Sequence, residues 1–177
     1  YIQQYRISKL KWVVTGGNTV QESIRNGVYH LKDKCNDDDT IIIHDSIRPL
    51  IDQDVISDVL VKCSKYGNAI SSLPYYEQIF YKKDELCTKK YIQRDKIRRL
   101  QTPQAYKMNK LYWAYNKAFE MNIGTSPTSY TNTMMVDLGE TLYFAAGSDK
   151  NIKLTTADDL DIFKALLLMQ NKYQEAD

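Results

Sequence analysis

An acidic and a basic side chain stand three positions apart in the segment His44-Asp45-Ser46-Ile47-Arg48-Pro49. The apolar run 40–44 before it predicts a strand buried on both faces. A carboxylate and a guanidinium at the carboxyl end of a strand can bind a metal ion, a hydroxyl or a phosphate. The alternative is a local pair between Asp45 and Arg48 that only fixes the loop, and the motif alone leaves both interpretations open.

A second candidate is the turn Gly16-Gly17-Asn18-Thr19, between an expected strand at 11–15 and an expected helix from Val20. Glycines let a phosphate or a base approach the backbone, and a helix N-terminus favours anions. Ser23 on that helix would face the same crevice. A plain tight turn and an exposed helical serine are the alternatives.

Two more segments carry polar groups that suit an anion. Gln101-Thr102-Pro103-Gln104 predicts a turn before a helix, and Thr102 could donate to a phosphate oxygen. Lys153 is isolated in the short apolar run 152–155, which predicts a strand. A buried lysine is costly unless it meets an anion, although a lysine at a strand edge can also reach solvent.

The elements that must position these residues alternate between strands and helices, which favours an α/β sandwich. Further strands are expected at 69–73 and 142–146, and helices at 52–66, 108–121, 134–138 and from Thr156 onward. Residues 75–100 differ, because they are rich in Tyr, Lys and Arg and contain two short β-like runs at 79–81 and 90–92. A polar hairpin with little core of its own usually rests on something else, and a partner subunit is one candidate.

Composition narrows the class of protein. The 177 residues suit one domain, and 43% hydrophobic and 26% charged residues are ordinary for a globular protein. A net charge of +2 is too small to predict nucleic-acid binding, and no apolar run is long enough to cross a membrane. Three scattered cysteines and two distant histidines predict no zinc site, and free thiols favour the cytoplasm.

The order of the four segments is more specific than any one of them. The ranges 16–27, 44–49, 94–104 and 151–160 together resemble the methylerythritol-phosphate and ribitol-phosphate cytidylyltransferases. The resemblance implies a Rossmann-like three-layer α/β sandwich with a mostly parallel sheet. It also implies one nucleotidyltransferase domain over residues 1–177, a homodimer, and a dimerisation arm at 75–100 that protrudes as a β-hairpin.

The resemblance implies roles for individual residues. Lys153 and Asp45 would be catalytic, and Asp45 would also hold Mg²⁺ where CTP meets the substrate. Arg48, Thr102 and Arg94 would bind the sugar-alcohol phosphate, with Arg94 carried by the arm into the neighbouring subunit's site. The residues expected to border the nucleotide are Gly16, Gly17, Asn18, Ser23 and Ser46.

Several positions depart from the family pattern and leave the substrate open. Val20 stands where an arginine is usual, Gln78 replaces a threonine, and 131–133 reads Thr-Asn-Thr in place of Thr-Asp-Asp or Thr-Asp-Glu. The family's Gly-rich triphosphate loop is not in the sequence, which begins without Met, so we expect this chain to lack the domain's N-terminal portion.

The resulting hypothesis is a cytidylyltransferase that joins CTP to ribitol 5-phosphate or a related alditol phosphate, giving a CDP-alditol for capsule or teichoic-acid synthesis. One alternative is methylerythritol 4-phosphate as the substrate, on the path to isoprenoids. Another is a non-catalytic dimeric fragment that binds nucleotide weakly or not at all. Val20 and the missing loop favour this fragment, whereas the retention of the Asp45, Arg48, Thr102 and Lys153 set opposes it.

Overall fold

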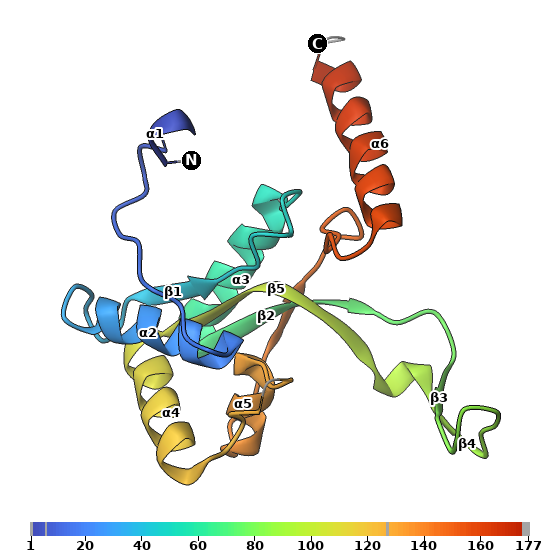
Figure 1. Ribbon diagram of the computed structural model, residues 1–177, viewed down its shortest axis with the longest axis horizontal. Coiled ribbons are helices and arrows are strands. Elements are labelled where there is room, and N and C mark those ends of the chain that lie inside the picture. Colours follow the sequence, from blue (N-terminus) through green and yellow to red (C-terminus); the bar gives the residue numbers. More distant parts are fainter. Residues whose placement is uncertain (1, 6, 127, 175–177) are drawn as a thin grey trace. The chain divides into compact units, whose positions relative to one another are not determined.

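The structure is a computed structural model that describes residues 2–5, 7–126 and 128–174 (Figure 1). The chain divides into two compact units, and each is described by itself. Unit 1 comprises Tyr1–Asp39 and Lys107–Thr141, and unit 2 comprises Thr40–Tyr106 and Leu142–Asp177. The α/β class expected from the sequence is confirmed. One nucleotidyltransferase domain over 1–177 stays a prediction.

Unit 2 is built on a four-stranded sheet in the order β1-β5-β2-β6. Strand β2 pairs antiparallel with β5 and parallel with β6, so the sheet is mixed around its most buried strand. The strands are β1 (Thr40–Ile43), β2 (Asn68–Pro74), β5 (Arg98–Lys107) and β6 (Phe144–Ala146).

Strand β1 confirms the expected strand, but the expectation that both of its faces are buried is wrong. It lies at one edge of the sheet in the part of the chain that the structure describes, and Ile42 is 38% exposed. A strand with a sheet neighbour on one side has fewer side chains to cover it. The most buried strand is β2, whose first five residues are all buried.

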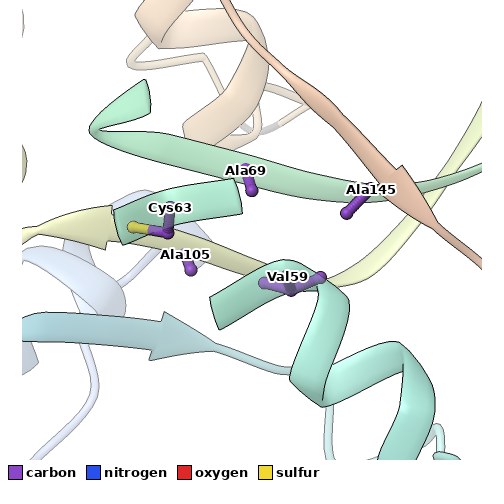
Figure 2. Packing of buried hydrophobic residues seen from close by; sticks show 5 residues of the cluster. All are labelled: Val59, Cys63, Ala69, Ala105 and Ala145. Carbon is purple, nitrogen blue, oxygen red and sulfur yellow. The ribbon is translucent and has the colours of Figure 1, made fainter. Parts of the chain in front are cut away.

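Helix α3 (Gln53–Tyr66) covers the sheet as the sequence predicted, beginning after Asp52 and ending at Gly67, whose φ of 83° suits glycine. Figure 2 shows the contact: Val59 and Cys63 of α3 face small alanines of the strands. Small side chains let the helix approach closely. The alanines are Ala69 of β2, Ala105 of β5 and Ala145 of β6.

Strand β5 overturns the turn expected at 101–104. Ile70 pairs with Gln104 whereas Ser72 pairs with Leu100, so β5 advances four residues while β2 advances two. The extra residues form a bulge around Thr102 and Pro103. Proline cannot donate to a sheet ladder and is therefore found at such irregular places, which are common beside active sites.

The hairpin expected at 75–100 is present, with β3 (Ile79–Tyr81) antiparallel to β4 (Lys90–Ile92) and a 3₁₀ turn at η1 (Arg94–Lys96). Its two strands form a sheet of their own, separate from the four-stranded sheet. In Figure 1 it lies at the far end of the segments that continue β2 and precede β5.

The segment 152–155 is not a strand, contrary to the sequence expectation. It is held instead by the Leu154 N–H, which donates to Ile47 O at 2.9 Å. Helix α6 (Ala157–Gln174) follows, and its expected cap is confirmed, because Thr156 Oγ1 accepts the Asp159 N–H at 3.2 Å.

Unit 1 is helical in the residues that the structure describes. The expected strand at 11–15 is wrong, since this segment makes no strand pairing there. Helix α4 packs against both α2 and α5. The expected short helix at 134–138 begins earlier than predicted, at Thr131. The helices are α1 (Ile2–Tyr5), α2 (Val20–Lys32), α4 (Met108–Met121) and α5 (Thr131–Asp137).

Candidate functional site

The loop after β1 is a compact turn that fixes both of its charged residues. The Arg48 N–H donates to Asp45 O at 2.9 Å, and His44 Nε2 lies 3.0 Å from Arg48 O. Ser46 occupies an exposed position within this turn. The backbone therefore presents Asp45 and Arg48 from one rigid corner.

Asp45 lies between two cations. Its Oδ2 is 3.5 Å from Arg48 Nε and 3.5 Å from Lys153 Nζ. The expected Asp45–Arg48 pair is confirmed, and the structure adds Lys153 to it. At 3.5 Å these are ion contacts and not well-formed hydrogen bonds. The three side chains thus stand together without being locked to one another.

Arg48 is the least exposed member of this cluster, with 12% of its side chain accessible. Burial lowers the pKa of Arg48, and the Asp45 carboxylate raises it in opposition. Arginine nevertheless stays protonated at neutral pH because its ordinary pKa lies so far above that range. A fixed, partly desolvated positive charge of this kind suits a phosphate ligand.

Thr102, in the bulge of β5, joins the same corner. Its Oγ1 accepts the Asp45 N–H at 3.0 Å. A hydroxyl that accepts one hydrogen bond still has its own hydrogen to donate. Thr102 can therefore hold the Asp45 backbone and, in the same conformation, donate to a ligand oxygen as the sequence suggested.

Asn151 connects these pieces and was missed as a site residue by sequence reasoning. It is fully buried, its Nδ2 donates to Thr102 O at 2.7 Å, and its own O accepts from Arg48 Nη1 at 2.7 Å. The available signal was its place two residues before Lys153 in a polar-then-apolar run. Nothing in its residue type alone distinguished it from a turn asparagine.

A pocket of about 250 Å³ opens beside this cluster. Three cationic side chains, those of Arg48, Arg99 and Lys153, contribute to its wall. Arg99 also pairs with Asp149 at 2.6 Å. A cavity with this balance of charge favours an anionic ligand that carries additional hydroxyl groups. The remaining lining residues are Leu100, Gln101, Asn151, Ile152 and Asp159.

Asp159 fixes the chain just after Lys153. Its Oδ2 accepts the Thr155 N–H at 2.9 Å, the Thr155 hydroxyl at 2.8 Å and the Thr156 N–H at 2.8 Å. These hydrogen bonds, the one from the Thr155 backbone foremost, lower the pKa of Asp159 from 3.8 to about 2. An ionised carboxylate therefore closes the loop that carries the lysine.

The turn expected to bind nucleotide lies in unit 1 and is ordered by side chains of α2. The Gly17 N–H donates to Ser23 Oγ at 3.0 Å, and Ser23 Oγ donates to Thr19 O at 2.9 Å. The Asn18 N–H donates to Glu22 Oε2 at 2.6 Å. A Cβ on Gly17 would lie 2.2 Å from Glu22 Cβ, so this close approach requires glycine. Gly16, Gly17, Asn18 and Ser23 are thereby brought together in one turn.

A buried network of polar side chains supports the start of α2, next to that turn. Gln21, the second residue of α2, is fully buried, and its Oε1 accepts the Tyr115 hydroxyl at 3.0 Å. Tyr115 in turn lies 2.7 Å from Thr131 Oγ1. Burial raises the pKa of Tyr115, which keeps its hydroxyl protonated. Thr131, the residue before the two positions that depart from the family pattern, thus fixes the start of α2.

Arg94 lies apart from the other candidates in its own chain. It is exposed, and its Nη1 donates to Tyr76 O at 3.0 Å within the hairpin. Among the residues that the structure describes, it makes no contact with Asp45, Arg48 or Lys153. The expected role of Arg94 in a neighbouring subunit stays a prediction.

The described residues contain no group of three or more His, Cys, Asp or Glu side chains that could hold a metal ion. Asp45 is the carboxylate of the charged cluster. Mg²⁺ commonly binds through one or two carboxylates together with substrate phosphates and water. Asp45 fits that mode, in which most of the ligands come from the substrate.

Comparison with known proteins finds similarity to cytidylyltransferases over nearly the whole chain. The family model described as IspD, 2-C-methyl-D-erythritol 4-phosphate cytidylyltransferase, matches residues 2–169. The chain is 62% identical over 167 residues to the ribitol-5-phosphate cytidylyltransferase of Lacticaseibacillus paracasei, covering 94% of this chain and 71% of that protein. It is 30% identical over 167 residues to the 2-C-methyl-D-erythritol 4-phosphate cytidylyltransferase of Clostridium acetobutylicum, covering 94% and 69%.

A solved structure supports the fold. The crystal structure of 4-diphosphocytidyl-2C-methyl-D-erythritol synthase from Anaerococcus prevotii superposes with a TM-score of 0.79 over 94% of this chain and 76% of that one. At 20% sequence identity this similarity establishes the α/β fold and no more.

Proposed function

The chain belongs to the IspD family of cytidylyltransferases, and we propose that it joins CTP to ribitol 5-phosphate, giving CDP-ribitol and pyrophosphate. The observation that carries the choice of substrate is the 62% identity to a ribitol-5-phosphate cytidylyltransferase, against 30% to a methylerythritol-phosphate enzyme. CDP-ribitol would then feed the synthesis of capsule or teichoic-acid polymers.

The reaction is a displacement at phosphorus. An oxygen of the ribitol phosphate attacks the α-phosphorus of CTP, a new P–O bond forms, and the bond to the departing pyrophosphate breaks. A phosphate monoester is already mostly dianionic at pH 7, because its second pKa is about 6. The attacking oxygen therefore needs no general base, and catalysis depends on positioning and on cations near the crowded oxygens.

The charged cluster of unit 2 can supply that positioning. Lys153 would lie against the reacting phosphates, and Arg48 and Thr102 would bind the phosphate of the sugar alcohol. Asp45 holds Arg48 and Lys153 close to each other, since its carboxylate is 3.5 Å from each. The pocket of about 250 Å³ beside them would take the polyol, whose hydroxyls can pair with its amide and carboxylate groups.

Members of this family use divalent cations, and we propose Mg²⁺ for this protein. Asp45 would be the protein ligand, with CTP phosphates supplying others. The ion would neutralise charge on the triphosphate. Arg48 and Lys153 would bring the two phosphate-bearing substrates together even if the ion neutralised only part of the negative charge on the triphosphate.

The turn of unit 1 would receive the nucleotide. Gly16 and Gly17 expose backbone, and Asn18 and Ser23 stand at the start of α2, where a helix terminus favours polar or anionic groups. Ser46 would border the nucleotide from the Asp45 turn. The hydrogen bonds of Ser23 to Gly17 and Thr19 support its role in shaping the turn.

We propose that the hairpin is a dimerisation arm for a second copy of this chain. A two-stranded hairpin is marginally stable alone, and this one exposes Phe80, Tyr81 and Tyr91. It also carries a pocket of about 510 Å³ beside Phe80, Tyr91 and Arg94. A partner subunit would cover the aromatic side chains and receive Arg94 in its own site.

We also propose that the chain forms one nucleotidyltransferase domain that works in the cytoplasm without a nucleic-acid or membrane partner. No helix in the described part of the chain is long and apolar enough to cross a bilayer. Cys35, Cys63 and Cys87 are free thiols, which favour a reducing compartment. The net charge of +2 offers little attraction to nucleic acid or to an anionic membrane.

The direct test is product analysis. The full-length protein is incubated with CTP, Mg²⁺ and ribitol 5-phosphate, and the products are resolved by anion-exchange chromatography and mass spectrometry. Stoichiometric CDP-ribitol and pyrophosphate are expected. Reactions without ribitol 5-phosphate serve as the control, and pyrophosphate release that does not depend on it would point to hydrolysis of CTP and against the proposal.

A further inference from the structure

We infer that Asn151 is a positioning residue. Its side chain holds Thr102, and through Thr102 it holds the backbone of Asp45. Both are thereby kept in place to receive the sugar-alcohol phosphate. The inference rests on the proposed function. It adds a residue that does not itself touch the reacting atoms but sets the geometry of the residues that do.

Three separate segments meet at Asn151. Its Nδ2 donates to Thr102 O in the β5 bulge at 2.7 Å. Its backbone O accepts from Arg48 Nη1 at 2.7 Å and from Gln101 Nε2 at 3.3 Å. Asn151 therefore joins the loop after β1, strand β5 and the loop before α6.

The contact with Thr102 continues to Asp45. Thr102 Oγ1 accepts the Asp45 N–H at 3.0 Å, so a path of two hydrogen bonds runs from the Asn151 amide to the Asp45 backbone. Buried networks of this kind hold their members in one arrangement, because breaking one link leaves a polar group without a partner. Loss of the amide would free Thr102 to move and would loosen the Asp45 turn with it.

Lys153 is bracketed by the same arrangement. On its N-terminal side, the Asn151 backbone is held by Arg48 and Gln101. On its C-terminal side, the Leu154 N–H donates to Ile47 O at 2.9 Å. The lysine thus lies between two anchored residues, which limits the positions that its ammonium group can reach.

The side-chain oxygen of Asn151 shows which part of the side chain contributes to the fold. Its Oδ1 is buried and has no hydrogen-bond partner among the described residues. A buried acceptor without a partner adds nothing to the stability of a fold. The contribution of the side chain therefore lies in its Nδ2 donor, which bonds to Thr102 O.

Asn68 offers a matched control within unit 2. It is 1% exposed, and its Oδ1 accepts the Tyr143 N–H at 3.2 Å, so it too is a buried asparagine bonded to distant backbone. None of the hydrogen bonds and ion pairs described above for Asp45, Arg48 and Lys153 involves Asn68. A purely structural asparagine should therefore behave like Asn68.

The experiment compares steady-state kinetics and thermal unfolding of the full-length protein for the wild type, Asn151→Ala, Asn151→Asp and Asn68→Ala. For both Asn151 variants we expect KM for ribitol 5-phosphate to rise at least about 10-fold, as for loss of a hydrogen bond that organises a binding site, and KM for CTP to rise less than KM for ribitol 5-phosphate. Asn68→Ala should lower Tm about as much as Asn151→Ala does, and it should leave both KM values near those of the wild type.

The outcomes separate the two claims. If the wild type releases pyrophosphate and the Asn151 variants have an unchanged KM for ribitol 5-phosphate, the inference about Asn151 is overturned and the proposed function stands. The same holds if Asn68→Ala raises that KM as much as Asn151→Ala does. If Asn151→Ala does not fold, Asn151→Asp, which keeps the volume and removes the donor, decides. A wild type without transferase activity would overturn the proposed function and this inference together.

Discussion

Lys153 Nζ lies 3.5 Å from Asp45 Oδ2, although the two residues come from segments far apart in the sequence. The same oxygen lies 3.5 Å from Arg48 Nε. One carboxylate therefore gathers two cations that would otherwise repel each other, and both cations line a pocket suited to anions. An incoming phosphate can replace the two long ion contacts of the Asp45 carboxylate.

Substitution of Lys153 tests whether this cluster carries the chemistry. We expect Lys153→Ala to lower turnover at least ~10²-fold, the usual cost of removing one donor aimed at a transition state. Initial rates of pyrophosphate release measure it. Lys150→Ala is the matched control, since Lys150 is an exposed lysine of the same loop. Near-normal turnover of Lys153→Ala would remove this residue from the mechanism.

Ser23 tests the nucleotide turn. Ser23→Ala removes the acceptor of the Gly17 N–H and the donor to Thr19 O, so the turn should lose its fixed shape. We expect KM for CTP to rise about 2- to 12-fold, since a hydrogen bond contributes ~0.5–1.5 kcal/mol, while KM for ribitol 5-phosphate stays the same. Ser57→Ala, at an exposed serine of α3, provides the control. An unchanged KM for CTP would argue against the turn as a nucleotide site.

Mixed dimers test whether the hairpin carries Arg94 into the partner's site. Arg94→Ala and Lys153→Ala are each expected to be weakly active alone. If the arm is exchanged, a mixed dimer has one site with both residues intact, and random assortment of equal amounts restores about a quarter of wild-type activity. Activity is measured after the two variants are mixed under conditions that allow subunit exchange. A mixture no more active than its components would place Arg94 outside the partner's site.

The pH dependence of stability tests the closure of the Lys153 loop by Asp159. Its pKa is lowered to about 2 in the folded protein, from 3.8, chiefly by the hydrogen bond from the Thr155 backbone. As pH falls, the unfolded state takes up the proton first, so the stabilisation is fully present above about pH 4 and disappears towards pH 2. The difference in Tm between the wild type and Asp159→Asn should follow that course.

Asp158→Asn is the control for this measurement, because Asp158 stands next to Asp159 in the first turn of α6 and holds none of its three hydrogen bonds. Its variant should shift Tm little at any pH. A wild-type advantage over Asp159→Asn that is the same at pH 3 and pH 7 would contradict the role given to the Asp159 carboxylate.

Local signals made most elements of the fold predictable. The β-branched run of β1 and the ends of α3 at Asp52 and Gly67 correspond to elements that the structure confirms, although the Asp52 side chain makes no capping hydrogen bond. Strand β5 was missed because Pro103 and its polar neighbours are typical of a turn, whereas pairing with β2 accommodates them in a bulge. Tertiary pairing of this kind is not visible in local sequence.

The opposite error occurred at 152–155, where an apolar run predicted a strand. This segment is held by Ile47 and by the Asp159 carboxylate, and no sheet ladder is involved among the described residues. Residue type and order were enough to single out Asp45, Arg48, Thr102 and Lys153, which the structure brings together. Asn151 could not be identified in this way, because its importance comes from contacts with residues distant in the sequence.

The proposed substrate is tested most directly by the ratio of kcat/KM for ribitol 5-phosphate and methylerythritol 4-phosphate, measured by pyrophosphate release from CTP in separate reactions of the full-length protein. We expect release when both Mg²⁺ and ribitol 5-phosphate are present, and a preference for ribitol 5-phosphate of at least about 100-fold, as expected where buried polar groups of a site recognise substrate hydroxyls. A preference for methylerythritol 4-phosphate would contradict the proposed substrate, and release with neither would contradict the proposed reaction.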